Sequence, residues 1–248
     1  MTKVAALIPA RRASSRFPNK PLAKILGKSM ILRVAELTAE AVGLENTYVA
    51  TDCAKIASVV VDGGFQVVMT SSDALTGTDR IAEAAQQIDA DLFINVQGDE
   101  PMLDPASILK VIEHAKLHPD TVINGFAPIG ASEYPADVNI PKCVIASDGR
   151  LIYMSRAAVP SFKDPRKCPS VYHKQVCIYA FTREHLERYA SADAKAPCEA
   201  SEDIEILRFL DMGYQVQMVE LPGDTLAVDV PQDILDVEAA MRAAGCHE

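Results

Sequence analysis

The sequence has neither a signal-peptide pattern nor an apolar stretch long enough to span a lipid bilayer. It also has no excess of positive charge, because 34 Asp and Glu residues outnumber 24 Lys and Arg residues and give a net charge of -10. A general affinity for nucleic acid or for an anionic membrane is therefore not expected, and any bound anion must be held by a local basic site. We expect a cytoplasmic protein with no nucleic acid and no membrane among its partners.

The signature motifs of several enzyme classes are also missing. Gly27-Lys28-Ser29 looks like the end of a P-loop, but Leu22 stands where that motif requires a glycine. No Gly-x-Gly-x-x-Gly follows the first apolar run, which argues against a dinucleotide-dependent oxidoreductase, and no Gly-x-Ser-x-Gly indicates a hydrolase. The six cysteines form no Cys-x-x-Cys pair and have no His at zinc-finger spacing, so we interpret them as reduced and mostly structural.

The apolar content of 49% is enough for a substantial core in a chain of 248 residues. From residue 1 to about 130, short apolar runs alternate with helical periods, which predicts βαβ units and an α/β fold with a mostly parallel sheet. The expected strands cover residues 4–8, 47–50, 65–69 and 92–96. The first helix is expected after a capping Ser29 and before Gly43.

Residues 140–182 differ in pattern, with short β-like pieces and a proline-rich loop at 160–173. Beyond them the sequence predicts helices at about 182–190 and 202–212, strands near 215–220 and 225–228, and a final helix from Pro231. No internal repeat is present. We expect a single domain over residues 1–248, with 140–182 as an extension within it.

A cationic cluster follows the first predicted strand. Pro9 ends that strand, so Arg11, Arg16 and Lys20 lie on the loop at its C-terminal edge, together with Ser14. Ligands bind at this edge in open α/β sheets, and guanidinium and ammonium groups match phosphate oxygens. The cluster therefore indicates a polyphosphate site, although a solvated basic loop is the alternative.

Two aspartates occupy similar places far apart in the sequence. Asp99 follows an apolar strand in Gln97-Gly98-Asp99-Glu100-Pro101, and Asp229 follows the short run 226–228 and precedes Pro231. Their hard carboxylate oxygens suit Mg²⁺, and phosphoryl or nucleotidyl transfer needs cations around the phosphates and a metal held by a few carboxylates. An acidic turn and a helix-capping aspartate are the alternatives.

Two further segments are placed to meet a substrate. Thr76-Gly77-Thr78-Asp79-Arg80 precedes an amphipathic helix, whose N-terminal amides could receive an anion or a base edge. Tyr153-Met154-Ser155-Arg156 ends in an arginine that could bind a substrate carboxylate as a fork. A capped helix start and a surface salt bridge explain these segments about as well.

Together these motifs resemble the sugar-acid cytidylyltransferases, most closely those for 3-deoxy-manno-octulosonate (Kdo), the CMP-Kdo synthetases. The resemblance covers nearly the whole chain. The matching segments, in chain order, are Ile8-Pro9-Ala10-Arg11, Lys20-Pro21-Leu22, Val49-Ala50-Thr51-Asp52, Val68-Met69-Thr70-Ser71, Gly77-Thr78-Asp79-Arg80, Val96-Gln97-Gly98-Asp99-Glu100-Pro101, Tyr153-Met154-Ser155-Arg156, Ile178-Tyr179-Ala180-Phe181 and Val228-Asp229-Val230-Pro231.

The resemblance implies a three-layer α/β/α sandwich of the nucleotide-diphospho-sugar transferase type. It implies a homodimer formed through the 140–182 extension, with CTP and a 2-keto-3-deoxy sugar acid as substrates and Mg²⁺ as cofactor. The implied nucleotide-binding residues are Arg11, Ser14, Arg16, Lys20, Thr51, Arg80 and Gln97. The implied catalytic residues are Lys20, Asp99 and Asp229, of which the two aspartates hold the metal. The implied sugar-binding residues are Arg156, Gln175, Tyr179 and Glu205.

The implied reaction is in-line attack of the sugar's anomeric hydroxyl on the α-phosphorus of CTP. It gives CMP-Kdo and pyrophosphate, without a covalent enzyme intermediate, for lipopolysaccharide or capsule synthesis. Positioning and charge neutralisation would supply most of the catalysis.

Two positions depart from the family on the acceptor side: Gln175 stands where a histidine is usual, and Ile206 replaces a polar residue. Because polar pocket groups discriminate sharply between sugars, the same reaction on another acid sugar, 8-amino-Kdo or a nonulosonate, is the first alternative. A nucleotide-binding regulator without catalysis is the second. The retained carboxylates and phosphate-binding cations argue against it.

Overall fold

The computed structural model describes residues 2–12, 17–131, 133–223 and 226–245. Within this part of the chain, a nine-stranded sheet has seven strands in the order β11-β7-β10-β6-β1-β4-β5. β10 is antiparallel to β6 and β7, whereas the other neighbours along this path are parallel. The predicted α/β fold with a mostly parallel sheet is confirmed. The strands are β1 (Val4–Ala10), β4 (Thr47–Thr51), β5 (Gln66–Met69), β6 (Leu92–Val96), β7 (Val122–Pro128), β10 (His173–Thr182) and β11 (Val216–Glu220).

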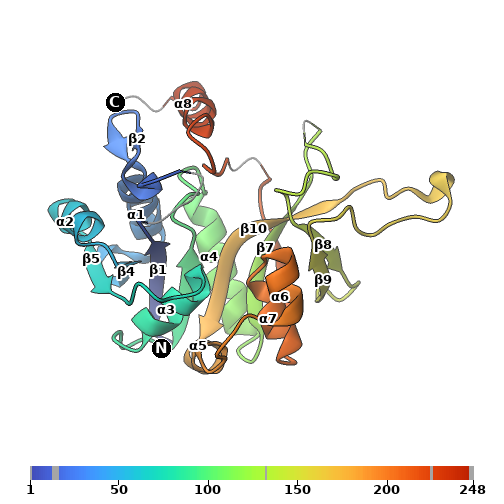
Figure 1. The fold of residues 1–248 in the computed structure, drawn as a ribbon, viewed down its shortest axis with the longest axis horizontal. Coiled ribbons are helices and arrows are strands. Elements are labelled where there is room, and N and C mark those ends of the chain that lie inside the picture. The colour runs from blue at the N-terminus through green and yellow to red at the C-terminus, as the bar shows by residue number, and fades with distance from the viewer. Residues whose placement is uncertain (1, 13–16, 132, 224–225, 246–248) are drawn as a thin grey trace.

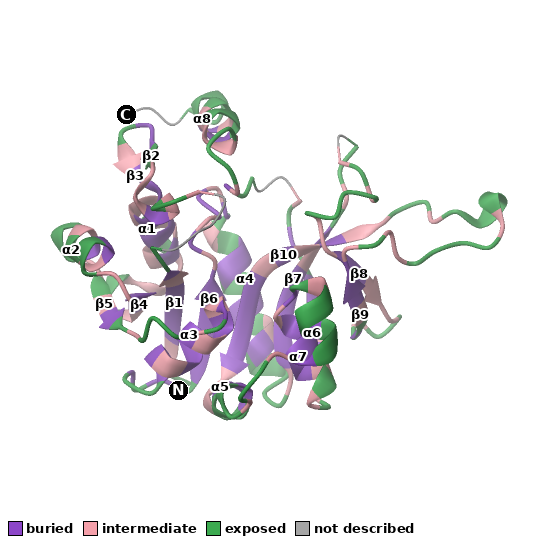
Figure 2. Cartoon of the chain, viewed as in Figure 1, coloured by how far each residue is buried: buried purple, intermediate pink, exposed green. Residues whose placement is uncertain are grey.

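Helices cover both faces of the sheet because the central strands are apolar on both sides. In β1, Ala5 and Leu7 pack into one core, and Ala6 and Ile8 pack into the other. The first core is closed by α3 (Gly77–Ala85), α5 (Arg183–Ala190) and α7 (Ile206–Asp211). The second is closed by α1 (Met30–Val42), α2 (Ala54–Asp62) and α4 (Pro105–Leu117). The result is the three-layer arrangement in Figure 1, with buried strands between partly exposed helices in Figure 2.

The 140–182 extension continues the main sheet. A hairpin of β8 (Lys142–Ile145) and β9 (Leu151–Ser155) pairs through β8 with the N-terminal part of β10. Between β9 and β10 the chain forms an arm that projects from the body and carries a short 3-10 helix, η3 (Pro165–Lys167) (Figure 1). The predicted loop at 160–173 lies in this arm. A short helix, α6 (Pro197–Glu202), precedes α7.

The C-terminal helix packs against the segment that precedes α1. α8 (Asp233–Ala243) places Val237 and Met241 in a small core with Ile25 and Val228. Ile25 belongs to a two-stranded hairpin, β2 (Lys24–Ile25) and β3 (Lys28–Ser29), which follows the 3-10 helix η1 (Lys20–Leu22). This packing brings the segment before α8 to the edge of the sheet where β1 ends. A second 3-10 helix, η2 (Leu44–Asn46), joins α1 to β4.

Three local predictions differ from the structure. The helix expected at 202–212 is divided into α6 and α7, with Asp203 between them at a φ of 50°. Residues 226–228 form no strand; instead the Val228 amide donates to the Asp99 carbonyl at 2.9 Å. Ser29 occupies the N-cap of α1, but its hydroxyl makes no capping bond, and the Met30 amide donates to the Ala23 carbonyl at 2.8 Å. Among the described residues, no helix has both the length and the apolar character needed to cross a bilayer.

Candidate active site

Two adjoining cavities open at the C-terminal edge of β1 and β6. The first has a volume of about 200 Å³ and is lined by residues that include Arg11, Lys20, Gly77 and Arg80. The second has a volume of about 430 Å³ and lies between β10 and the 133–141 segment. The four residues that line both cavities are Gln97, Asp99, Glu205 and Asp229. A ligand in the first cavity would therefore meet a ligand in the second at these side chains.

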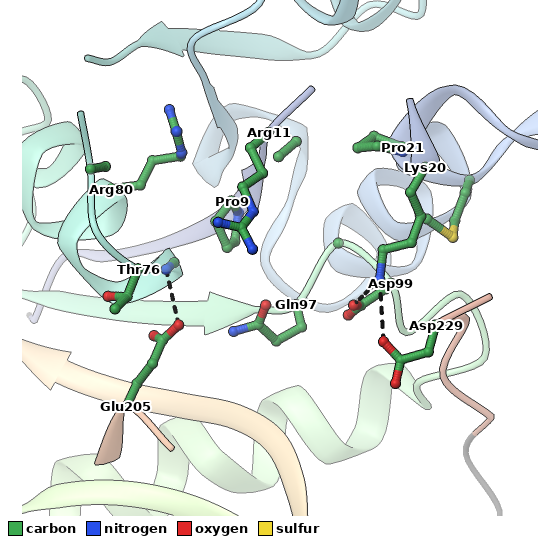
Figure 3. A pocket seen from close by; sticks show the side chains of 15 residues that line it. Pro9, Arg11, Lys20, Pro21, Thr76, Arg80, Gln97, Asp99, Glu205 and Asp229 are labelled. Atoms are coloured by element: carbon green, nitrogen blue, oxygen red, sulfur yellow. Dashed lines mark hydrogen bonds and ion pairs between the residues drawn. The ribbon is translucent and has the colours of Figure 1, made fainter. Parts of the chain in front are cut away.

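Lys20 joins the two predicted carboxylates. It lies in η1, and its ammonium donates to Asp99 Oδ2 at 2.6 Å and lies 3.8 Å from Asp229 Oδ1 (Figure 3). The same ammonium donates to the Val228 carbonyl at 2.8 Å. Only 14% of the Lys20 side chain is exposed, so these contacts are made at the wall of the cavity and little screened by water. Three segments that are far apart in the sequence thus meet at one ammonium group.

The same arrangement fits a divalent cation. Asp99 and Asp229 are close enough to bind one ammonium, and their oxygens are the hard ligands that Mg²⁺ prefers. Among the described residues, no group of three or more His, Cys, Asp or Glu side chains is arranged for a metal. Mg²⁺ usually binds one or two carboxylates and completes its shell with water and substrate phosphates, so two aspartates suffice for this kind of site.

The remaining predicted nucleotide residues lie at different depths. Arg11, on the loop after β1, is exposed and extends into the first cavity in Figure 3. Gln97 lies between the two cavities, directly after β6. Ser14 and Arg16 lie outside the described residues. Thr51 is fully buried, and its hydroxyl accepts from the Cys53 amide at 3.2 Å; it lines neither cavity as described, so its nucleotide contact stays a prediction.

Arg80 is held rigidly beside the first cavity. Its guanidinium donates to the Thr70 hydroxyl and to the Ser71 carbonyl, and it lies 3.6 Å from Asp52 Oδ2. The polar residues at the ends of β4 and β5 therefore position this arginine. Only 3% of Arg80 is exposed, so a planar donor of fixed orientation remains at the cavity wall.

Glu205 binds the N-terminus of α3. Its carboxylate accepts from the Gly77 amide at 2.9 Å, from the Thr78 amide at 2.8 Å and from the Thr78 hydroxyl. The sequence indicated that these amides could receive an anion or a base edge, and in the structure they bind a carboxylate of the protein itself. Burial raises the pKa of the Glu205 carboxyl, and the hydrogen bonds from Thr78 and Gly77 oppose this rise. Its predicted contact with the sugar stays a prediction.

A buried ion-pair network links the two helices whose ends meet at Glu205. Arg208 is fully buried and donates to both oxygens of Glu199, at 2.6 Å each, and to Asp79 Oδ1 at 2.8 Å. Its guanidinium also stacks on the Tyr189 ring, 3.8 Å from the centroid. Because Asp79 belongs to α3 and Arg208 to α7, the network fixes the distance between the two helices whose ends meet at Glu205.

The predicted sugar-side residues meet in the second cavity. Arg156 donates to three backbone carbonyls, those of Val138 (2.8 Å), Glu202 and Asp203 (3.0 Å), rather than to a carboxylate. A guanidinium has five N–H donors, so two remain for a ligand. Gln175, Tyr179 and Glu205 line the same cavity. Ile206, which replaces a polar residue of the family, is buried in the first core and contributes nothing to the cavity as described.

Sequence reasoning missed several residues of the second cavity. Lys174 pairs with Glu133 at 2.5 Å, and both line the cavity. The fully buried Lys142 donates to the carbonyls of Asp137 and Arg156 and so fixes the cavity wall. A lysine flanked by apolar residues in a short strand was the one signal available for Lys142. Glu133 lies in a loop segment and Lys174 in a strand segment, and neither is part of a recognisable sequence motif.

Residues 5–219 match the family model described as cytidylyltransferase. The chain is 40% identical to the 3-deoxy-manno-octulosonate cytidylyltransferase of Syntrophotalea carbinolica, over 96% of this chain and 98% of that protein. It is 41% identical to the 8-amino-3,8-dideoxy-manno-octulosonate cytidylyltransferase of Shewanella oneidensis, over 95% and 97%. Among solved structures, CMP:2-keto-3-deoxy-manno-octonic acid synthetase complexed with CTP matches with a TM-score of 0.90 and 33% identity, over 98% of this chain and 100% of that one.

Proposed function

Because the chain belongs to the cytidylyltransferase family, we propose that it transfers CMP from CTP to the anomeric hydroxyl of 3-deoxy-manno-octulosonate, giving CMP-Kdo and pyrophosphate. The observation that carries the proposal is the meeting of Lys20, Asp99 and Asp229 where the two cavities join. A reaction between two substrates needs its charged groups at the point where the substrates touch. The product would serve lipopolysaccharide or capsule synthesis in the cytoplasm.

The first cavity suits the nucleotide. Arg11 and Lys20 would bind the triphosphate, with Ser14 and Arg16 proposed for the same task, and Arg80 and Gln97 would contact the cytidine part. Thr51 is proposed as a nucleotide contact on resemblance alone. Mg²⁺ held by Asp99 and Asp229 would neutralise charge at the phosphates. These nucleotide contacts would hold the α-phosphorus in line between the acceptor hydroxyl and the departing pyrophosphate.

The second cavity suits the sugar acid. The free donors of Arg156 would bind the sugar carboxylate as a fork, and Gln175, Tyr179 and Glu205 would meet its hydroxyl groups. The anomeric hydroxyl would then lie near Asp99 and Asp229, which line both cavities. Its oxygen bonds to the α-phosphorus and gives up its proton to solvent as the bond to pyrophosphate breaks, so no group on the protein is modified.

One observation favours 8-amino-Kdo as a second candidate substrate. Among the described residues, the lining of the second cavity includes six carboxylate side chains and two cationic ones, Arg156 and Lys174. An excess of carboxylates suits a substrate that carries an ammonium group. The Shewanella oneidensis relative acts, by its name, on the 8-amino sugar.

We also propose a homodimer formed through the 140–182 extension. Three large apolar side chains are exposed within this extension, namely Ile152, Phe162 and Val171, and two more, Tyr134 and Val138, lie in the segment just before it. Ile152 lies on β9, and Phe162 and Val171 lie in the arm between β9 and β10, which projects from the body (Figure 1). Exposed apolar side chains gathered on a projection are typical of an interface between protein chains.

The test is pyrophosphate release from CTP and Mg²⁺ with each of Kdo, 8-amino-Kdo and a nonulosonate. We expect turnover with Kdo or with its 8-amino form, and the ratio of kcat/KM values identifies the preferred sugar. Turnover of the nonulosonate alone would contradict the proposal. Tight CTP binding without pyrophosphate release from any sugar would identify a regulator instead.

A further inference from the structure

An irregularity in the sheet lies beside the second cavity. β10 pairs with β7 in one register up to Val176 and in a shifted register from Tyr179, so the strand bulges between them. A bulge leaves backbone groups without their ladder partners. The Asn124 side chain of β7 replaces those partners, because its Nδ2 donates to the Val176 carbonyl at 3.1 Å and to the Ile178 carbonyl at 2.9 Å.

These bonds determine which way the Asn124 amide faces. A backbone carbonyl only accepts hydrogen bonds, so the NH₂ group of Asn124 must face both carbonyls and Oδ1 must point away. Asn124 is fully buried, so the amide has no water-facing alternative. Its Oδ1 is thus a fixed acceptor, and the group that meets it is the Nε2 of Gln175 at 3.0 Å.

The fixed acceptor on Asn124 in turn orients Gln175. The Gln175 Nε2 donates to Asn124 Oδ1 and also lies 3.1 Å from the Tyr179 hydroxyl, so both of its hydrogens have partners. Burial, with Cys177 and Glu205 nearby, raises the pKa of Tyr179 and keeps that hydroxyl protonated. In the described part of the chain, no group hydrogen-bonds the Gln175 Oε1. Gln175 lines the second cavity, so Oε1 is the atom of this amide left for a ligand.

We propose that Asn124 is a positioning residue that locks the Gln175 amide with Oε1 toward the acceptor sugar, so that the enzyme selects sugars with a hydrogen-bond donor at this point. The donor is a hydroxyl or an ammonium group. The inference rests on the proposed function and adds a rule of specificity to it. An unlocked glutamine could flip and either accept from a donor or donate to an acceptor on the sugar, whereas the locked amide can only accept from a donor.

The experiment measures kcat/KM for pyrophosphate release, using the preferred sugar acid and a set of analogues that each lack one hydroxyl or the amine. The enzymes are the wild type, Gln175→Met, Asn124→Leu and the double variant. Gln217→Met is the matched control, because Gln217 lies on β11, is not among the residues that line either cavity as described, and has a side chain that donates to the Asp148 carbonyl at 3.1 Å. The KM for CTP, which occupies the other cavity, reports on damage to the fold.

For the wild type, we expect one analogue to lose about 10- to 100-fold in kcat/KM, because it leaves Oε1 unpaired. For Gln175→Met, the kcat/KM values of the parent sugar and of that analogue should agree within about twofold. Asn124→Leu should weaken the discrimination in the presence of Gln175 and have no further effect on it in the Gln175→Met background. Gln217→Met should match the wild type, and the KM for CTP should be unchanged throughout.

The results distinguish a failure of the proposed function from a failure of the proposed role of Asn124 and Gln175. If no sugar acid is turned over, the proposed function fails. If sugars are turned over but Gln175→Met discriminates among the analogues as the wild type does, Oε1 does not select the sugar. If a folded Asn124→Leu discriminates as the wild type does, Asn124 does not lock Gln175. Either result overturns the inference and leaves the proposed function standing. Should Asn124→Leu not fold, the analogue series on the wild type and Gln175→Met still decides whether Oε1 selects a donor. The position of the sensitive group, at an amine or at a hydroxyl, identifies which donor Oε1 binds.

Discussion

At the scale of single residues, the site depends on charged groups that only the folded chain brings together. Lys20, Asp99 and Asp229 come from η1, from the loop after β6 and from the segment before α8. Gly98 contributes by its lack of a side chain, because a Cβ there would lie 2.9 Å from the Pro9 carbonyl. That carbonyl belongs to β1. Gly98 therefore allows the carboxylate loop to lie against the end of that strand.

Replacing Asp99 by asparagine should reduce turnover at least about 100-fold. The neutral amide is a poor Mg²⁺ ligand and weakens the contact with Lys20, while its size leaves the fold intact. Pyrophosphate release measures the effect, and thermal melting checks the fold. Asp104→Asn is the matched control, because Asp104 caps α4 through the Ala106 amide, outside both cavities, and asparagine caps equally well. Near-normal turnover of Asp99→Asn would remove Asp99 from the metal site.

How far the sequence predicts these residues depends on the kind of signal each one has. Asp99 follows an apolar strand, and such ends gather at one edge of a parallel sheet, so its place follows from the pattern. Asn124 has no such signal. Its role depends on a bulge in β10, more than fifty residues later in the chain, and nothing in the sequence around either residue indicates that bulge.

At the scale of elements, contacts between distant segments override local patterns. The helical period at 202–212 predicts one helix, but Arg156 donates to the carbonyls of Glu202 and Asp203, which a continuous helix would use for its own bonds. The helix therefore ends there, and α7 begins at Ile206. The break places Glu205 at the start of α7, where its carboxylate can reach the N-terminus of α3.

The start of α5 should make stability depend on pH. His185 Nδ1 accepts from the Thr182 amide at 3.2 Å, and burial lowers the pKa of His185 below its ordinary 6.5, although Glu184 and Asp120 oppose the shift. The folded state thus binds the proton more weakly than the unfolded state. Stability is complete above the unfolded value and decreases as the pH falls through about 6.5 toward the folded value.

His185→Gln should flatten this pH dependence. Glutamine can still accept from the Thr182 amide in the capping box, but it does not titrate. We expect its melting temperature to fall less than that of the wild type between neutral pH and pH ~5, as measured by circular dichroism. His118→Gln, at an exposed position beyond α4, should keep the wild-type profile. Parallel profiles for wild type and His185→Gln would show that another group causes the acid loss.

At the scale of the whole molecule, the sheet is predictable and the extension is less so. A central strand that is apolar on both sides needs helices on both faces, so the three layers follow from the composition of β1 and β6. The extension has short strands whose pairing depends on the antiparallel β10, a strand that follows a long arm. Its large apolar side chains Ile152, Phe162 and Val171 are exposed and belong to none of the three cores of the described chain.

Ile152 on β9 offers a direct test of the proposed dimer. Its side chain is 60% exposed, and a lysine there would cost the chain little when it is alone but would bury a charge in the interface. An unpaired buried charge costs about 3 kcal/mol or more, which would weaken dimer association by a factor of about 100 or more. Light scattering coupled to size-exclusion chromatography should give twice the chain mass for the wild type and the chain mass for Ile152→Lys. Leu117→Lys, a comparable change at a 73% exposed leucine at the end of α4, should leave the dimer intact. A monomeric wild type would exclude the proposed dimer. A dimeric Ile152→Lys would show that β9 lies outside the interface, because a charge on β9 weakens association only if β9 is covered by the partner chain.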